Sequence, residues 1–251
     1  SKGIGLHSCG GNRIYHNAFV GRDLDGYTYN CTANSWDKGY PSGGNYWGHN
    51  PGADSMSGAN QDQRGRDGLG DSPVYLRKSP ESWVVWDGDT SSLEMDPNNF
   101  DRYPAMWRVE SFDAGMFGGE SYSVDISSSS AVSDFFMSPG DRSMSFTVSG
   151  GSGTEGVCRA SVPQDLMWCD SPEEWTVKMD GKPVDRKVAE DSDFTNIFFE
   201  YLHSTHSVEI TGTHSLAPSP ECQFGDTVGD LFNSRGSPTT AEGYLDIAGV
   251  D

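Results

Sequence analysis

The sequence has few basic residues. Of its 251 residues only 17 are Lys or Arg, whereas 37 are Asp or Glu, and the formal net charge is −20. A surface with this charge repels nucleic acid and anionic lipid, so we expect neither as a partner. The excess of acid is typical of a solvated acidic surface, and the alternative is a surface suited to divalent cations or high salt.

Long hydrophobic runs are also missing. Apolar residues make up 34% of the chain, and no stretch of them approaches the roughly 20 residues needed to span a bilayer, so we expect no membrane insertion. There is no signal peptide and the chain begins with Ser1 rather than Met, so we expect a mature or excised piece whose targeting segment is gone. The 31 glycines favour a loop-rich β protein over a helical one.

No catalytic motif is present. The chain contains no G-x-S-x-G sequence, no P-loop and no zinc-ligand spacing. None of its five cysteines forms a CxxC or CxxCH pattern, which excludes zinc-ribbon, thioredoxin-like and c-type haem proteins. We therefore predict that the protein is not an enzyme.

A spacing of 22 residues recurs near the N-terminus. The pattern Cys-x-x-Asn occurs at residues 9–12 and again at 31–34, each time after a short alternating run. A repeat of about 20 to 29 residues with one β unit per copy is typical of a solenoid. We expect Asn12 and Asn34 at equivalent corners of successive coils, where their side chains can hydrogen-bond along the stack.

The cysteines leave two interpretations open. Equivalent residues on adjacent coils lie about 4.8 Å apart, and a disulfide accepts Cα separations of roughly 4.4–6.8 Å. Cys9 and Cys31 are therefore either bridged or stacked as reduced thiols. Cys158 and Cys169, eleven residues apart, have the same two alternatives, and Cys222 is the candidate for the unpaired thiol.

The first 76 residues resemble a known family. The segments GIGLHSCGGNRIYHNAFVG and NSWDKGYPSGGNYWGHNPGADSMSGANQDQRGRDGLGDSPVYL are similar to the C-terminal end of NosD-like right-handed parallel β-helix proteins, which are surface or periplasmic proteins abundant in archaea. The similarity covers residues 3–76 and lies in many spaced Trp, Gly and Asp positions. It implies the last coils of a right-handed parallel β-helix, in an extracellular or cell-surface protein.

The loop at residues 34–50 is unusually aromatic. We predict that it closes the end of the β-helix, because large rings cover an open coil at little entropic cost; the alternative is stacking against sugar. The aromatic residues concerned are Trp36, Tyr40, Tyr46 and Trp47. Only about two coils precede this cap, fewer than the three that a solenoid usually needs. We therefore expect either that the natural protein continues upstream of Ser1 or that a partner stacks on the opposite face, namely another copy of the chain or another cell-surface protein.

A loop that follows the cap is rich in acidic residues and glycine. The candidate ligands of a calcium ion are Asp54, Asn60, Asp62, Asp67 and Asp71. Calcium takes six to eight oxygen ligands, often from such loops, which makes it the candidate cofactor. Two arginines between the candidates weaken this hypothesis, and a turn braced by Asx hydrogen bonds is the alternative.

The second half predicts an antiparallel β-sandwich of the Ig-like kind. Eight short β runs are expected at residues 107–112, 121–126, 132–137, 143–148, 156–162, 175–179, 197–202 and 207–211. Asp180-Gly181 predicts a type I′ hairpin turn. We expect β-helix coils and cap at 1–76, a linker at 77–102, the sandwich at 103–215, and a Pro-rich link with a tail at 216–251.

This half also resembles a known module. Segments such as VSGGSGTEGVCRASVPQDLMW and WTVKMDGKPV are similar to a β-sandwich that follows NosD-like β-helices in archaeal surface proteins, which implies a spacer or adhesion unit. The sequon at Asn30 fits a secreted protein. The leading hypothesis is a structural, adhesive or self-assembling surface protein. The alternatives are a carbohydrate-binding protein, a polysaccharide lyase or hydrolase using a pair such as Asp62 and Asp67, and copper handling.

Overall fold

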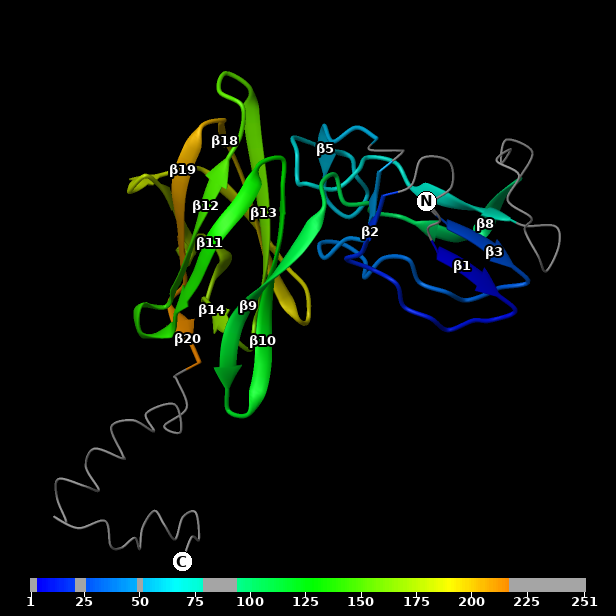
Figure 1. Cartoon of the computed structure of the whole chain (residues 1–251), viewed down its shortest axis with the longest axis horizontal. Helices are drawn as coiled ribbons and strands as arrows, with labels where there is room; N and C mark the ends of the chain where they lie inside the picture. The colour runs from blue at the N-terminus through cyan, green and yellow to red at the C-terminus, as the bar shows by residue number, and fades with distance from the viewer. Residues whose placement is uncertain (1–3, 21–25, 49–51, 79–93, 217–251) are drawn as a thin grey trace, which may run out of the picture.

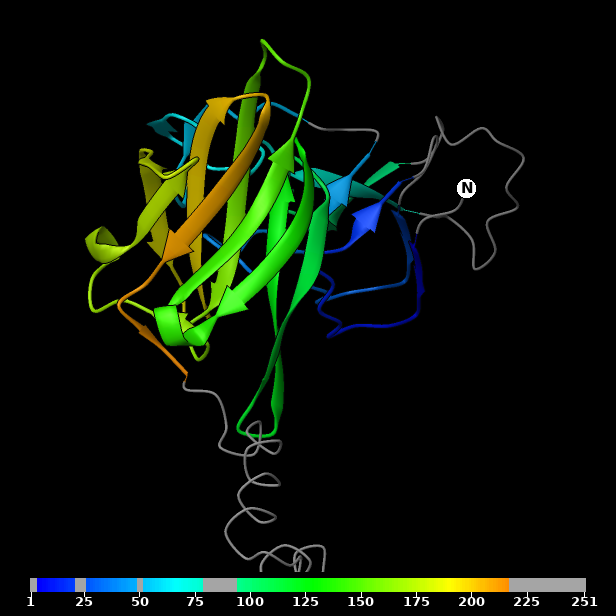
Figure 2. The same cartoon turned by 60° about the vertical axis from the view of Figure 1, so that its left-hand side comes forward.

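The computed structural model describes residues 4–20, 26–48, 52–78 and 94–216, and these residues confirm an all-β protein. They form two parts, an N-terminal unit (described residues up to 106) and a two-sheet domain (residues 107–216), which lie side by side in both views (Figures 1 and 2). No helix in the described part is long and apolar enough to cross a membrane.

The N-terminal unit contains a four-stranded sheet with the order β1-β3-β7-β8. Its strands are β1 (Ile4–His7), β3 (Gly26–Tyr29), β7 (Val74–Lys78) and β8 (Glu94–Asp101). β1 and β3 run parallel with a register of 22 residues, and the bridges Gly10–Thr32 and Arg13–Ser35 keep the same offset. The 22-residue repeat is therefore confirmed as the spacing between two stacked chain segments.

Short strands complete this unit. β2 (Ala18–Phe19) pairs in parallel with β4 (Tyr46–Trp47), and β5 (Met56–Ser57) pairs antiparallel with β6 (Gln63–Arg64). The core of the unit is built on two indoles, because Trp36 is 0% and Trp47 2% exposed. Each indole removes roughly 200 Å² from water, worth about 5 kcal/mol before the entropy of ordering is subtracted. Val74 and Leu76 fill the space beside them.

Strand β8 closes one end of this core with polar side chains. Its amide Asn99 is fully buried and accepts hydrogen bonds from Trp36 Nε1 at 3.2 Å and from Asn34 Nδ2 at 3.1 Å. Its carboxylate Asp101 is equally buried and accepts from Trp47 Nε1 at 2.8 Å. The predicted linker at 77–102 thus includes an ordered strand, which hydrophobic periodicity missed because the buried face of β8 is polar.

The two-sheet domain consists of two five-stranded antiparallel sheets that share one core (Figure 2). The first sheet has the order β17-β18-β13-β10-β9, with β9 (Val109–Phe117), β10 (Glu120–Ser128), β13 (Glu155–Pro163), β17 (Arg186–Glu190) and β18 (Phe194–Leu202). The second has the order β11-β12-β19-β15-β16, with β11 (Ala131–Ser138), β12 (Ser143–Ser149), β15 (Thr176–Met179), β16 (Lys182–Pro183) and β19 (Thr205–Thr211). All eight β runs predicted in this half are strands.

The turn at Asp180-Gly181 is also confirmed. Both residues have positive φ angles, 50° and 76°, and Met179 pairs with Lys182 across the hairpin. The remaining elements are β14 (Met167–Trp168), which pairs with β20 (His214–Ser215), and the 3₁₀ turns η1 (Pro139–Asp141) and η2 (Pro172–Glu174).

Replacing Asn99 tests the polar closure. Asn99→Ala leaves the buried Trp36 N–H and the carbonyl of Cys31 without their partner, so we expect the free energy of unfolding to fall by about 2–4 kcal/mol. Asn98→Ala, at the exposed neighbouring position, is the matched control and should change it by less than about 0.5 kcal/mol. Chemical unfolding monitored by tryptophan fluorescence measures both, and equal effects would contradict the closure role.

Candidate functional site

The N-terminal unit covers the outer face of the first sheet, and we call this contact surface the junction. Side chains alternate between the two faces of a strand. On β13 and β18, Cys158 and Ile197 face the domain core, whereas Arg159, Asn196 and Phe198 face outward. The outward residues are nevertheless only 6%, 4% and 4% exposed. The junction therefore buries polar groups that would otherwise be solvated.

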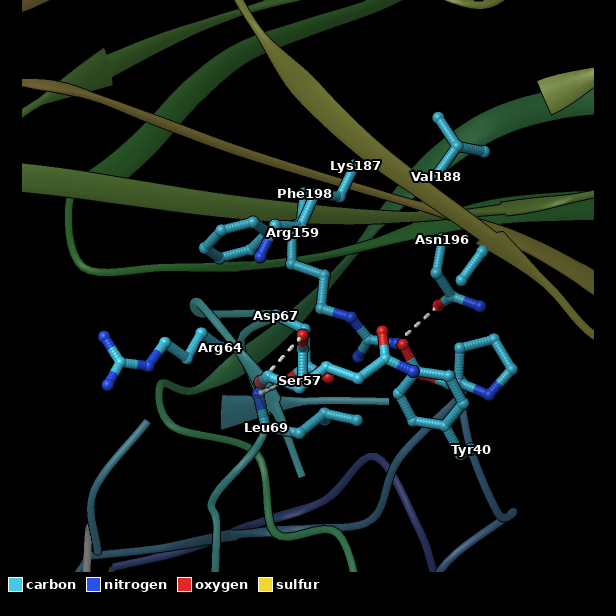
Figure 3. A pocket seen from close by; sticks show the side chains of 13 residues that line it. Tyr40, Ser57, Arg64, Asp67, Leu69, Arg159, Lys187, Val188, Asn196 and Phe198 are labelled. Atoms are coloured by element: carbon cyan, nitrogen blue, oxygen red, sulfur yellow. Dashed lines mark hydrogen bonds between the residues drawn. The ribbon is translucent and has the colours of Figure 1, made fainter. Parts of the chain in front are cut away.

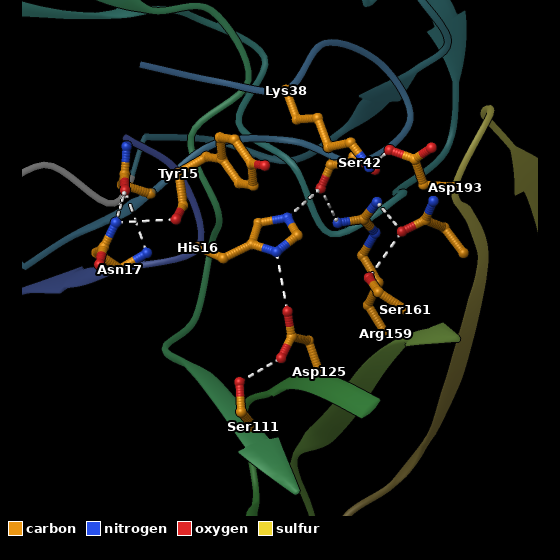
Figure 4. A network of polar contacts seen from close by, with 12 residues as sticks. Tyr15, His16, Asn17, Lys38, Ser42, Ser111, Asp125, Arg159, Ser161 and Asp193 are labelled. Carbon is orange, nitrogen blue, oxygen red and sulfur yellow. Dashed lines mark hydrogen bonds and ion pairs between the residues drawn. The ribbon is translucent and has the colours of Figure 1, made fainter. Parts of the chain in front are cut away.

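The guanidinium of Arg159 is the centre of the junction (Figure 4). It donates to the backbone carbonyls of Pro41 and Ser42 in the N-terminal unit and, at 2.8 Å, to the side-chain oxygen of Asn196. Burial lowers the pKa of Arg159 to about 10, against the opposing effect of carboxylates including that of Asp67, so the side chain stays charged at neutral pH. Gly68 permits this approach, because a Cβ there would lie 2.9 Å from Arg159 Cδ.

His16 forms a second link across the junction (Figure 4). Its Nδ1 lies 2.9 Å from the carboxylate of Asp125 on β10, and its Nε2 lies 3.1 Å from the carbonyl oxygen of Ser42. Burial raises the pKa of Asp125, but hydrogen bonds from His16 and Ser111 outweigh it and hold this pKa below its usual value. Both ring nitrogens therefore face hydrogen-bond acceptors.

Charged side chains surround the buried centre. Lys38 of the N-terminal unit lies 2.6 Å from Asp193 and 4.1 Å from the ring centroid of Phe194. Arg66 pairs with Glu155 at 3.0 Å, and the ammonium of Lys187 donates to the Arg66 carbonyl at 2.7 Å. Such exposed pairs contribute little stability singly.

A cavity of about 280 Å³ lies within the junction (Figure 3). Its lining residues come from both parts and are Tyr40, Pro41, Ser57, Gln63, Arg64, Asp67, Leu69, Arg159, Lys187, Val188, Ala189, Asn196 and Phe198. The exposed residues Gln63, Arg64 and Lys187 are at its mouth, and buried residues form its floor. A small polar ligand is the class of molecule that such a cavity can accept.

Three of the predicted calcium ligands bind backbone N–H groups of their own loop. Asp54 accepts from the amides of Asp67 and Gly68 at 3.1 and 3.0 Å; Asp67 accepts from those of Gly58 and Leu69; Asp71 accepts from those of Ser55 and Met56. Asn60 and Asp62 are exposed. No group of three or more His, Cys, Asp or Glu side chains that suits a metal occurs in the described ranges. This geometry matches the Asx-braced alternative, and calcium binding stays a prediction.

The predicted cap aromatics separate into two groups. Trp36 and Trp47 are in the core of the N-terminal unit, so their faces are not available to a sugar. Tyr46 is half-buried in β4. Tyr40 lines the junction cavity and lies 6.0 Å from the Tyr103 ring. Of these four, Tyr40 lines a cavity in the described part of the chain.

The four described cysteines are free thiols. Cys9 and Cys31 lie side by side, with 3.5 Å between their sulfur atoms, as the 22-residue repeat requires. Cys158 is fully buried in the core of the two-sheet domain, where burial raises the pKa of its thiol above the usual range, and Cys169 is half-buried. Cys222 and the tail at 217–251 lie outside the described residues. The sequon residue Asn30 is exposed, as glycosylation would require.

Sequence reasoning missed most of the junction. Arg159, His16, Asp125 and Asn196 are separated by up to 180 positions, and none belongs to a recognisable motif. The one available signal is the composition of β13 and β18, where charged and amide residues occur on the alternate positions of otherwise apolar strands. Polar residues at alternate positions of a strand normally face water. The sequence of β13 and β18 therefore does not reveal that this face is covered by the N-terminal unit.

Comparison of the chain with known protein families, characterised proteins and solved structures finds no match.

Arg159 should matter more than any exposed ion pair. Arg159→Met removes the guanidinium that donates to the Pro41 carbonyl, and it removes one of the two contacts made by the Ser42 carbonyl and by the Asn196 oxygen, which keep His16 and Ser161. We expect a loss of about 3–5 kcal/mol in the free energy of unfolding. Arg66→Met removes only solvent-exposed pairs and should cost less than about 1 kcal/mol. Urea unfolding of the two variants measures the difference; similar losses would show that the junction does not depend on the buried guanidinium.

Asp54 should make stability depend on pH. Burial raises its pKa to about 6 from an ordinary 3.8, so between these values the folded chain holds a proton that the unfolded chain releases. Its contribution is complete below pH 3.8 and is lost as the pH rises to about 6. The wild type should therefore lose stability relative to Asp54→Asn over this interval, whereas Asp62→Asn, at an exposed position, should track the wild type. A parallel course for wild type and Asp54→Asn would contradict this assignment.

Proposed function

We propose that the protein is a non-enzymatic structural or adhesive component of an extracellular or cell surface, and that it self-assembles through an open β-helix end. In this proposal the N-terminal unit is the last part of a right-handed parallel β-helix, and the two-sheet domain is an Ig-like spacer. The observation that carries the proposal is the asymmetry of the N-terminal unit. At the β8 end of its stack the buried polar side chains have partners, whereas at the other end Asn12 and Asn17 are exposed.

Two asparagine ladders display this asymmetry. Asn12 Nδ2 donates to Asn34 Oδ1 at 2.8 Å, and Asn34 in turn donates to Asn99 of β8. In the second ladder, Asn17 Nδ2 donates to Asn45 Oδ1 at 3.1 Å. Both ladders end on buried side chains at the β8 side, whereas their first members, Asn12 and Asn17, are exposed. A further coil could continue both ladders with the same chemistry.

The apolar side chains of the first coil show the same difference between the two ends of the stack. Residues of the first coil pack against the indole core but stay half-buried, namely Ile4, Leu6, Ile14 and Phe19. Strand β1 is the edge of its sheet, and an exposed edge pairs readily with another strand. We take a second copy of the chain as the partner, because it presents the same edge and the same half-buried row. Another cell-surface β-helix protein would use the same edge.

The alternatives have less support. A lyase or hydrolase pair of Asp62 and Asp67 would need both carboxylates at one groove, but Asp67 is only 7% exposed and accepts bonds from its own loop. Copper handling would need histidines that meet at one ion. His7 stacks on Tyr29 at 4.8 Å, whereas His16 is held in the junction by Asp125, so the two imidazoles lie in different surroundings. Carbohydrate binding finds its only support in the junction cavity.

Assembly is tested by light scattering and electron microscopy of the purified chain, with and without calcium. We expect concentration-dependent oligomers, filaments or rings. Val20 follows the edge strand β2 and is 51% exposed, so Val20→Asp should weaken association about tenfold or more by placing a charge at the open end.

Leu202→Asp is the matched control, because Leu202 is 73% exposed at the end of β18, in the other part of the chain. It should assemble as the wild type does. A wild type that stays monomeric at all concentrations, or equal losses in the two variants, would overturn assembly through the open end.

A further inference from the structure

The junction cavity is positively charged in a strongly acidic protein. Three of its lining side chains are cations, Arg64, Lys187 and Arg159, and one is a carboxyl, Asp67. The guanidinium of Arg159 already donates hydrogen bonds to the carbonyls of Pro41 and Ser42 and to the Asn196 oxygen. Arg64 and Lys187 are exposed at the mouth, and in the described part of the chain neither forms an ion pair with a carboxylate. The mouth therefore attracts an anion.

The floor of the cavity holds a buried donor without an acceptor. The Asn196 side chain is only 4% exposed, and its Nδ2 has no hydrogen-bond partner among the described residues. The orientation of this amide is fixed, because its oxygen accepts from Arg159 at 2.8 Å (Figure 3) and from Ser161 Oγ at 2.7 Å. Buried N–H groups are nearly always paired in native proteins, and an unpaired one at a cavity wall marks a place for a ligand oxygen.

The remaining walls suit a compact ring. Tyr40, Leu69 and Phe198 provide apolar surface, and Ser57 and Asp67 provide oxygen atoms that can accept or exchange hydrogen bonds. The volume of about 280 Å³ is near the lower end of the usual range for ligand pockets, roughly 300–1,000 Å³. This is room for one small ring with its substituents and too little for a nucleotide.

We propose that this cavity binds a sugar acid, a single pyranose ring that carries hydroxyl groups and one carboxylate. The carboxylate lies at the mouth against Lys187, a ring hydroxyl accepts the hydrogen bond of Asn196 Nδ2, and another donates to Asp67. An inorganic anion would use the cations but leave the apolar wall and the floor donor without partners. A neutral sugar would leave the mouth cations unpaired. The proposal does not depend on self-assembly.

The source of the ring can be a free sugar acid or the terminal unit of an acidic polysaccharide, and both have the same chemistry. The probes are glucuronate, a glucuronate-terminated oligosaccharide, glucose, acetate and inorganic phosphate, titrated by calorimetry and by ligand-observed NMR at low salt. We expect saturable binding of glucuronate, at least about tenfold weaker binding of glucose and acetate, and weakening by added salt. Tighter binding of the oligosaccharide would identify the polysaccharide end as the source.

Variants at the mouth localise the binding without threatening the fold. Lys187→Gln removes the charge but keeps an N–H that can reach the Arg66 carbonyl, and it should weaken glucuronate binding about tenfold or more. Lys182→Gln, an exposed lysine on β16 outside the cavity, should leave binding unchanged. No saturable glucuronate binding, equal affinity for phosphate or acetate, or equal effects of the two lysine variants would each overturn the proposal.

Discussion

The buried guanidinium of Arg159 is the constraint on which the arrangement of the two parts depends. A charge removed from water is costly unless its hydrogen bonds are replaced. On its own, the first sheet supplies Arg159 with one acceptor, the Asn196 oxygen. The other two are backbone carbonyls of residues 41 and 42 in the N-terminal unit. Docking buries the guanidinium, and these two carbonyls replace the water that it would bind on the uncovered sheet. The cavity beside it is lined by both parts and exists only when they are docked.

The two ends of the stack in the N-terminal unit differ in whether their polar side chains have partners. At the β8 side, indole N–H groups and asparagine amides meet buried acceptors, so the polar side chains at this end of the stack already have partners. On the other side the same kinds of group, Asn12, Asn17 and the half-buried apolar row, reach the surface. An element whose side chains are paired at one end and exposed at the other favours the addition of a partner at the exposed end.

Local patterns predicted much of the fold and little of the site. The 22-residue register, the Asn12–Asn34 contact, the eight strands and the Asp180-Gly181 turn each follow from neighbours in sequence or from a short repeat. Strand β8 could not be predicted in the same way, because it buries Asn99 and Asp101 where a periodicity search expects apolar residues. Arg159 was missed for a related reason: on an alternating strand it has the pattern of a solvated residue, and only the tertiary contact buries it.

The acidic composition of the chain affects the electrostatics of the junction. With a net charge of −20, the two parts repel each other, and this repulsion opposes docking. Four of the 17 basic residues are placed where they offset that repulsion, with Lys38, Arg66 and Lys187 around the junction and Arg159 within it. Salt screens the exposed cations and the repulsion together, but it screens a buried group much less. An acidic protein that keeps its central cation buried can therefore hold its two parts together over a wide range of ionic strength, while the cations left at the cavity mouth stay accessible to an anion.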